Sequence, residues 1–96
     1  MGLLSAEVIE QELQSASGWR VEGLALTKNF SFRSFAEAIA FLNNVAAKAE
    51  TANHHPDMDV RYDKVIIRSS SHDVGGITRR DFRLAIAINA IYALKT

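Results

Sequence analysis

The chain has 96 residues, which suits one small domain, and its 48% hydrophobic content excludes a disordered or fibrous chain. Eleven basic residues balance eleven acidic ones, so net charge gives no reason to expect direct binding of nucleic acid. The chain has no cysteine, which excludes disulfides, a thiolate nucleophile and cysteine-ligated metals.

Targeting and membrane segments are also not expected. The first residues, MGLLSAEVIEQELQ, reach acidic side chains before any long apolar run, unlike a signal or transit peptide. The longest strongly apolar stretch, Leu84 to Ile88, is too short to cross a bilayer. We therefore expect one domain over residues 1–96, located in the cytoplasm, whose small size favours self-association.

The first third of the chain predicts a helix followed by a hairpin. Ser5 is a candidate N-cap for an amphipathic stretch from Ala6 to Ala16. From Trp19 the apolar period changes to two, which indicates strands, and Gly23 marks a turn. The residues that share the parity of a buried strand face are Leu24, Leu26, Phe30 and Phe32.

A second helix is predicted from Ser34, which forms a capping box with Glu37, to about Ala52. It carries two apolar stripes. The stripe expected to dock on the sheet consists of Phe35, Ile39, Leu42, Ala46 and Ala49. The stripe left over consists of Ala38, Phe41 and Val45, and it predicts a self-association surface.

The rest of the chain predicts a second hairpin and a final helix. Two strands, Asp59–Tyr62 and Lys64–Ser70, are expected to turn at Asp63. Thr78 caps a helix from Arg79 to about Leu94, with Asp81 at its third position. Phe82 and Ile86 on this helix offer a competing interface. The order α-β-β-α-β-β-α predicts an α+β fold with helices on one face of a four-stranded antiparallel sheet.

All three histidines lie in the loops that precede and follow the second hairpin. His54 and His55 come before it and His72 comes after it, so both loops can share one sheet edge. Histidine can donate or accept a proton near neutral pH. The interleaved acidic residues are Glu50, Asp57, Asp59, Asp73 and Asp81. The alternative is that these are ordinary solvated loop histidines.

Other kinds of site fit the pattern less well. Adjacent His54 and His55 diverge on extended backbone, which disfavours a shared metal ion. Ser69-Ser70-Ser71 beside His72 lacks the nucleophile elbow of serine catalysis. Gly75-Gly76 could cradle a phosphate, but it is not a nucleotide fingerprint and suits a turn equally well.

Three segments resemble the pterin-4a-carbinolamine dehydratases, and the resemblance covers nearly the whole chain. They are ETANHHPD (residues 50–57), VRYDKV (60–65) and SHDVGGITRRD (71–81). The resemblance implies a hydro-lyase, 4a-hydroxytetrahydrobiopterin dehydratase, which removes water from 4a-hydroxytetrahydropterin to give quinonoid dihydropterin. That product regenerates the tetrahydrobiopterin-type cofactor of aromatic amino-acid hydroxylases.

The same resemblance implies a homodimer or homotetramer that needs no metal and no organic cofactor, with an aromatic amino-acid hydroxylase as a candidate partner. Neither nucleic acid nor a membrane is expected as a direct partner. Some animal members also bind a homeodomain transcription factor, so a dimerisation module is the alternative function. The complete histidine set favours the enzyme.

By resemblance, the family's active-site histidines fall on His54, His55 and His72, its proline on Pro56, and its acidic positions on Glu50 and Asp81. Loss of the hydroxyl as water requires one proton donor and one acceptor. We expect His54 and His72 to transfer protons, in an order left open, and His55 to bind substrate. Both members of the pair are expected to contribute little to stability, because they lie in loops.

The chain departs from the family pattern at two places. Asn53 stands where some members have an acidic residue, and Asp57-Met58 stands where many have Glu-Trp. Met58 is therefore expected either to leave the pterin-contacting wall thinner or to fill the same gap. Asp81 has a second interpretation, as the capping carboxylate of the final helix.

Overall fold

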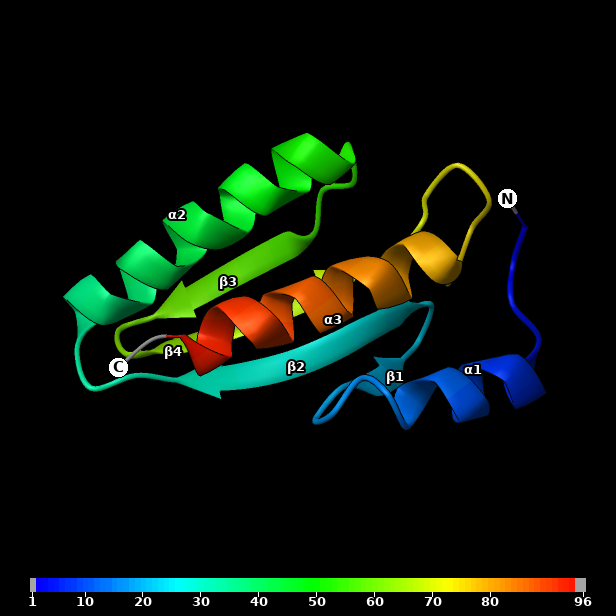
Figure 1. The fold of residues 1–96 in the computed structure, drawn as a ribbon, viewed down its shortest axis with the longest axis horizontal. Coiled ribbons are helices and arrows are strands. Elements are labelled where there is room, and N and C mark those ends of the chain that lie inside the picture. Colours follow the sequence, from blue (N-terminus) through cyan, green and yellow to red (C-terminus); the bar gives the residue numbers. More distant parts are fainter. Residues whose placement is uncertain (1, 95–96) are drawn as a thin grey trace.

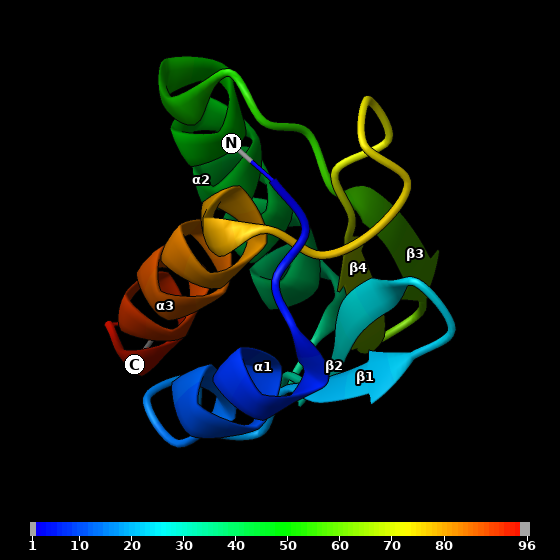
Figure 2. The same ribbon diagram turned by 90° about the vertical axis from the view of Figure 1, so that its right-hand side faces the viewer.

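The computed structural model describes residues 2–94 and confirms the predicted order of elements (Figure 1). The helices are α1 (Ala6–Leu13), α2 (Phe35–Ala52) and α3 (Arg79–Ala93). The strands are β1 (Arg20–Glu22), β2 (Ala25–Ser31), β3 (Asp57–Arg61) and β4 (Lys64–Ser69). They form one antiparallel sheet in the order β1-β2-β4-β3. Figure 2 shows all three helices on one side of it, which confirms the predicted α+β fold.

Both hairpins have two-residue turns whose first residue takes a positive φ. Gly23 has φ 59° between β1 and β2, and Tyr62 has φ 57° between β3 and β4. The expected burial of Leu24 is wrong, because Leu24 is the second residue of the first turn and is 68% exposed. The other three residues expected on this face, Leu26, Phe30 and Phe32, are buried as predicted.

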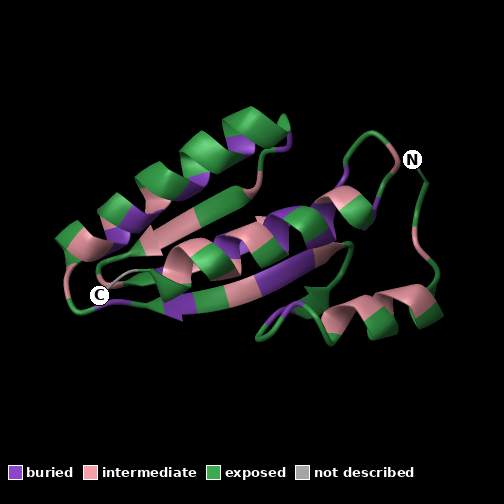
Figure 3. Ribbon diagram, in the orientation of Figure 1, coloured by how far each residue is buried: buried purple, intermediate pink, exposed green. Residues whose placement is uncertain are grey.

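The docking face of α2 differs in part from the expected one: of the stripe expected to dock, Ala49 is buried and Leu42 packs against the core. Ala38, Phe41 and Val45, expected to be left over, are buried against the sheet, whereas Phe35 is 52% exposed. Figure 3 shows the exposed side of α2 turned away from the strands. The ring of Phe41 lies 5.0 Å from those of both Phe30 and Phe32, so packing with the strand aromatics selects this face.

Some boundaries also differ from those expected. The first helix ends at Leu13, not Ala16, because the next three amides bond carbonyls three residues back, closing a tighter turn. The third strand begins at Asp57, so Asp57 and Met58 pair with β4 instead of lying in the loop. The ends of β4 and α3 each fall one residue before the expected position.

Hydrogen bonds of the Asn89 side chain hold α3 against the rest of the fold. The side-chain oxygen of Asn89 accepts from Trp19 Nε1 at 2.9 Å and from Lys28 Nζ at 2.8 Å. The Asn89 amide group in turn donates to the carbonyl of Ser17. Partial burial lowers the pKa of Lys28, since desolvation disfavours its charge.

In the part of the chain described, no helix is long and apolar enough to span a membrane.

Candidate active site

The two histidine-bearing loops lie at one end of the sheet. The first residue of β3, Asp57, pairs with Arg68 near the end of β4, so the chain before β3 runs beside the chain after β4. Figures 1 and 2 show both loops at this end, close to the start of α3. The loops that carry His54, His55 and His72 therefore share one sheet end, as the hairpin topology predicts.

His54 is turned inward by the way α2 ends. Asn53 takes the left-handed conformation, with φ 51°, and its amide donates to the carbonyl of Glu50. The amide of His54 donates to the carbonyl of Ala49 at 3.1 Å. These two bonds form a Schellman motif, in which asparagine is the commonest substitute for glycine. Asn53 therefore sets the direction in which the chain carries His54 back toward the core.

A buried carboxylate holds His54. Asp81 has no exposed surface, and its Oδ1 lies 2.6 Å from His54 Nε2. Its two oxygens also accept from the hydroxyls of Ser69 and Ser71 and from the backbone amide of Thr78. The hydrogen bond from the Thr78 amide completes the capping box of α3, so the capping role expected of Asp81 is confirmed. Without exposed surface, Asp81 can influence a substrate only through His54.

This pairing leaves one nitrogen of His54 for chemistry. Because the carboxylate can only accept, the hydrogen between the two groups lies on Nε2. Nδ1 is then the lone-pair nitrogen of the neutral ring. The residue is only 8% exposed, so the expectation that a loop histidine contributes little packing is wrong for His54.

The other residues expected in the site lie nearer the surface. His55 Nε2 is 2.5 Å from Glu50 Oε2, and both side chains are mostly exposed. Pro56 is half-buried in the link to β3. Met58 pairs with Ile67 and so projects from the helix-facing side of the sheet, at its β3 edge. Glu50 and His55 thus form an outer pair, separate from the buried pair of His54 and Asp81.

His72 is presented by a closed loop. The Ser71 carbonyl accepts from the amides of residues 74, 75 and 76, and the Ser71 amide donates to the Gly76 carbonyl. Within residues 2–94, the exposed His72 side chain makes no hydrogen bond or ion pair. The next residue, Asp73, accepts from Arg80 Nη2 at 2.8 Å, which attaches the loop to α3. That hydrogen bond lowers the pKa of the Asp73 carboxyl.

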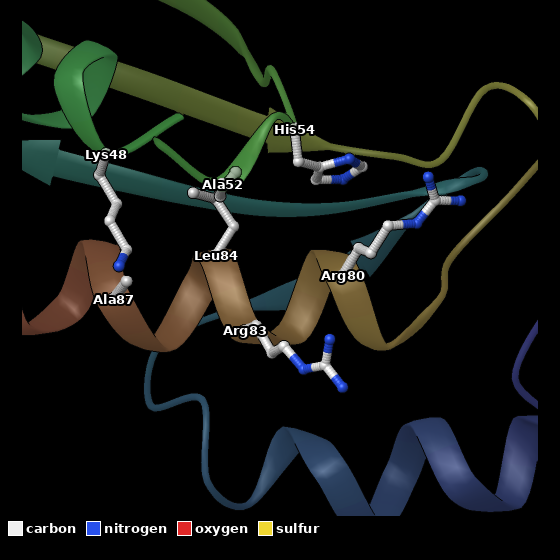
Figure 4. A pocket seen from close by; sticks show the side chains of 7 residues that line it. All are labelled: Lys48, Ala52, His54, Arg80, Arg83, Leu84 and Ala87. Atoms are coloured by element: carbon white, nitrogen blue, oxygen red, sulfur yellow. The ribbon is translucent and has the colours of Figure 1, made fainter. Parts of the chain in front are cut away.

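A hollow of about 310 Å³ opens beside His54, between the end of α2 and the first turns of α3 (Figure 4). Its volume lies at the lower end of the range typical of small-molecule sites. The residues that line it are Lys48, Ala52, His54, Arg80, Arg83, Leu84 and Ala87. Of the histidines, only His54 reaches it.

Several residues of this region were not predicted from sequence. Ser69 carries a readable signal, because it follows Val65 and Ile67 on a buried strand face, where a hydroxyl needs a buried partner. Lys48 and Arg83 carry none, since basic residues on a helix are usually solvated. No group of three or more His, Asp or Glu side chains suited to a metal ion occurs among the described residues.

Nearly the whole chain matches proteins of one family. The family model for pterin 4 alpha carbinolamine dehydratase matches residues 2–91. A protein of Roseiflexus castenholzii, provisionally named pterin-4-alpha-carbinolamine dehydratase, is 47% identical over 89 residues, covering 93% of this chain and 96% of its own. One of Acidobacterium capsulatum with the same provisional name is 43% identical over 91 residues, covering 95% and 99%.

A solved structure shares the fold. The crystal structure of a transcriptional coactivator/pterin dehydratase from Brucella melitensis superposes with a TM-score of 0.88 at 32% identity, covering 93% of this chain and 97% of that one. Family model, relatives and fold agree over nearly the full length. The chain belongs to the pterin-4a-carbinolamine dehydratase family.

Proposed function

We propose that the protein dehydrates 4a-hydroxytetrahydropterin by histidine acid–base catalysis, as a hydro-lyase that returns the tetrahydrobiopterin-type cofactor of aromatic amino-acid hydroxylases to use. The observation that carries the proposal is the buried pair of His54 and Asp81 at the wall of a ligand-sized hollow. In the reaction the C4a–O bond breaks, a ring N–H is lost, a C=N bond forms and water leaves. One group must accept the ring proton and another must protonate the departing hydroxyl.

His54 is suited to accept the ring proton. Its Nδ1 holds the free lone pair, and the Asp81 carboxylate on Nε2 stabilises the imidazolium that results. The three other donors to Asp81 fix that carboxylate, so the ring of His54 is held in one orientation. His54 is therefore the base in this proposal.

His72 is then the acid that protonates the hydroxyl. The proposal is supported by Arg80, which lines the hollow beside His54 and binds Asp73, the neighbour of His72. His55, paired with Glu50 at the surface, contributes to binding and orientation, with Pro56 and Met58 as further substrate contacts. After each turnover His54 loses its proton to solvent and His72 takes one from solvent, and no covalent intermediate is required.

The direct test is a spectroscopic assay of dehydration, with the carbinolamine generated in the cuvette. The protein should accelerate its first-order decay well above the spontaneous rate, and pre-treatment with a strong chelator should leave that rate unchanged. Decay at the spontaneous rate would refute the proposed function. Activity lost to the chelator and restored by zinc would instead refute the metal-free mechanism.

We also propose that the cytoplasmic form is a homodimer or homotetramer. The surface expected for self-association, Ala38, Phe41 and Val45, is buried within the chain. The proposed interface is instead the outer side of α2, where Phe35 is half-exposed beside the partly exposed Ile39 and Leu42. Burying a Phe-sized side chain stabilises by roughly 1.5–3 kcal/mol, and a symmetric interface would do so twice. Light scattering at micromolar concentration should give two or four times the chain mass, and a monomer would contradict this.

A further inference from the structure

The hollow beside His54 is strongly basic, although the chain as a whole is neutral. Three of its seven lining residues, Lys48, Arg80 and Arg83, are basic and none is acidic. Asp73 offsets the charge of Arg80 through their hydrogen bond. Asp81 lies behind His54 and is occupied by four donors.

Two of these charges have no protein partner. Within the described chain, neither Lys48 nor Arg83 takes part in an ion pair or a side-chain hydrogen bond. Their own helices supply none, because the residues three and four positions away are all uncharged or basic. Seven pairs between basic and acidic side chains at the surface of the described chain show that acidic partners are used elsewhere.

The lining residues are arranged along the hollow. Figure 4 shows His54 and Arg80 at one end, Ala52 and Leu84 in the middle, and Lys48 reaching from α2 toward Ala87 at the other end. The guanidinium of Arg83 points away from His54. The middle is thus apolar and suits the face of a flat ring, and the Lys48 end offers a free ammonium group.

A pterin without charge offers no anionic group to pair with the Lys48 ammonium. The ring of the carbinolamine and a hydroxylated side chain carry no negative charge near neutral pH, and the dehydration releases only water. From this mismatch, and resting on the proposed function, we infer that the substrate is a reduced pterin whose side chain ends in an anionic group, phosphate or carboxylate. The ring lies at the His54 end, and the anion binds Lys48.

Binding can be measured without turnover. The probes are three oxidised, fluorescent pterins that differ only in the end of the side chain, which is a hydroxyl, a phosphate or a carboxylate. The quantity of interest is the ratio of the Kd for the hydroxyl form to that for each anionic form. We expect a ratio of about tenfold for the preferred anion, decreasing as salt is added.

Matched variants locate the contact. Lys48→Gln should reduce the ratio to about twofold or less, because it removes the direct contact, and Arg83→Gln should reduce it by less. Lys64→Gln makes the same change on β4, where Lys64 pairs across strands with Ser31 and Arg61 on the face away from the helices, and should preserve the ratio. Thermal unfolding of each variant checks that it is folded.

The outcomes separate the inference from the function. A preference for phosphate or for carboxylate that depends on Lys48 supports the inference and identifies the group. Equal binding of all three pterins, binding of none, or a preference untouched by Lys48→Gln overturns it. The dehydration assay with a hydroxylated carbinolamine tests the function independently: acceleration there without an anionic preference preserves the function and refutes the inference. A Lys48-dependent anionic preference without acceleration would refute the proposed function and leave Lys48 as a contact for an anionic pterin that is bound but not dehydrated.

Discussion

His54 and His72 differ in environment far more than their positions in sequence indicate. His54 is almost fully buried and bonded to a carboxylate that accepts three further hydrogen bonds. His72 lies exposed on a loop that is closed by its own backbone and attached through its neighbour to Arg80. One histidine is held by the core, and the other is presented to solvent.

The difference separates two ways of positioning a catalytic imidazole. His54 is fixed by a second side chain, so its orientation and its contribution to stability are linked. His72 is fixed through backbone, so its ring can be removed without leaving a buried group unpaired. The same comparison predicts which variants lose stability, which lose activity and which lose both.

The largest effect is expected from Asp81→Ala. Removing this carboxylate leaves His54 Nε2, the Ser69 hydroxyl and the Thr78 amide without an acceptor in a buried site. The Ser71 hydroxyl loses one partner and keeps its hydrogen bond with Thr78 Oγ1. We expect the free energy of unfolding to decrease by about 3–5 kcal/mol, together with most of the activity. Urea denaturation measures the first. Asp59→Ala, on the exposed face of β3, is the matched control and should change stability by about 0.5 kcal/mol or less.

The second prediction compares the histidines directly. His54→Ala and His72→Ala should each lower kcat by about 10²–10⁴-fold, but only His54→Ala should also destabilise the fold, by about 1–3 kcal/mol. Steady-state kinetics and thermal unfolding on the same samples separate the two effects. Near-normal turnover of His72→Ala would exclude His72 as the acid, and an undiminished unfolding temperature of His54→Ala would contradict the buried pair.

The fold was largely predictable because its signals are local. The change of apolar period at Trp19, the capping residues Ser34 and Thr78, and the break before Pro56 each depend on a few neighbouring residues. The docking face of α2 was not predictable, because both stripes are apolar and the choice depends on where Phe30 and Phe32 lie in space. Periodicity defines a face of a helix but not its partner.

The histidines of the site were predictable from sequence, but the burial of one and the exposure of the others were not. The hairpin topology and the family motif bring the histidine loops to one end of the sheet. That His54 is buried depends on the left-handed residue Asn53 and on Ser69 and Ser71, which are distant from it in sequence. The basic wall of the hollow depends on α2 and α3 lying side by side, so the place of Lys48 in that wall is evident only in the folded chain.

A smaller effect is expected at the outer pair. His55→Ala removes a mostly exposed ring whose partner, Glu50, is itself in solvent. It should raise KM by about tenfold with kcat nearly unchanged, and shift stability by about 0.5 kcal/mol or less. Glu50→Gln should give a similar but weaker rise, since it removes the charge opposite His55. A loss of kcat as large as that of His72→Ala would make His55 a proton-transfer residue.

The smallest effect is expected in the link between the His72 loop and α3. The hydrogen bond from Arg80 lowers the pKa of Asp73, so the ionised carboxyl is favoured in the folded chain. The contribution of this pair to stability is therefore complete above the ordinary Asp pKa of about 3.9 and is lost as the pH falls through the lowered value. In Arg80→Gln the Asp73 carboxyl should titrate closer to its ordinary value, which NMR of its side-chain carbon can follow. Arg61→Gln, on the open face of the sheet, should leave that titration unchanged. If Asp73 titrated identically with and without Arg80, the loop that presents His72 would be held by its backbone alone, and the contrast with His54 would be sharper still.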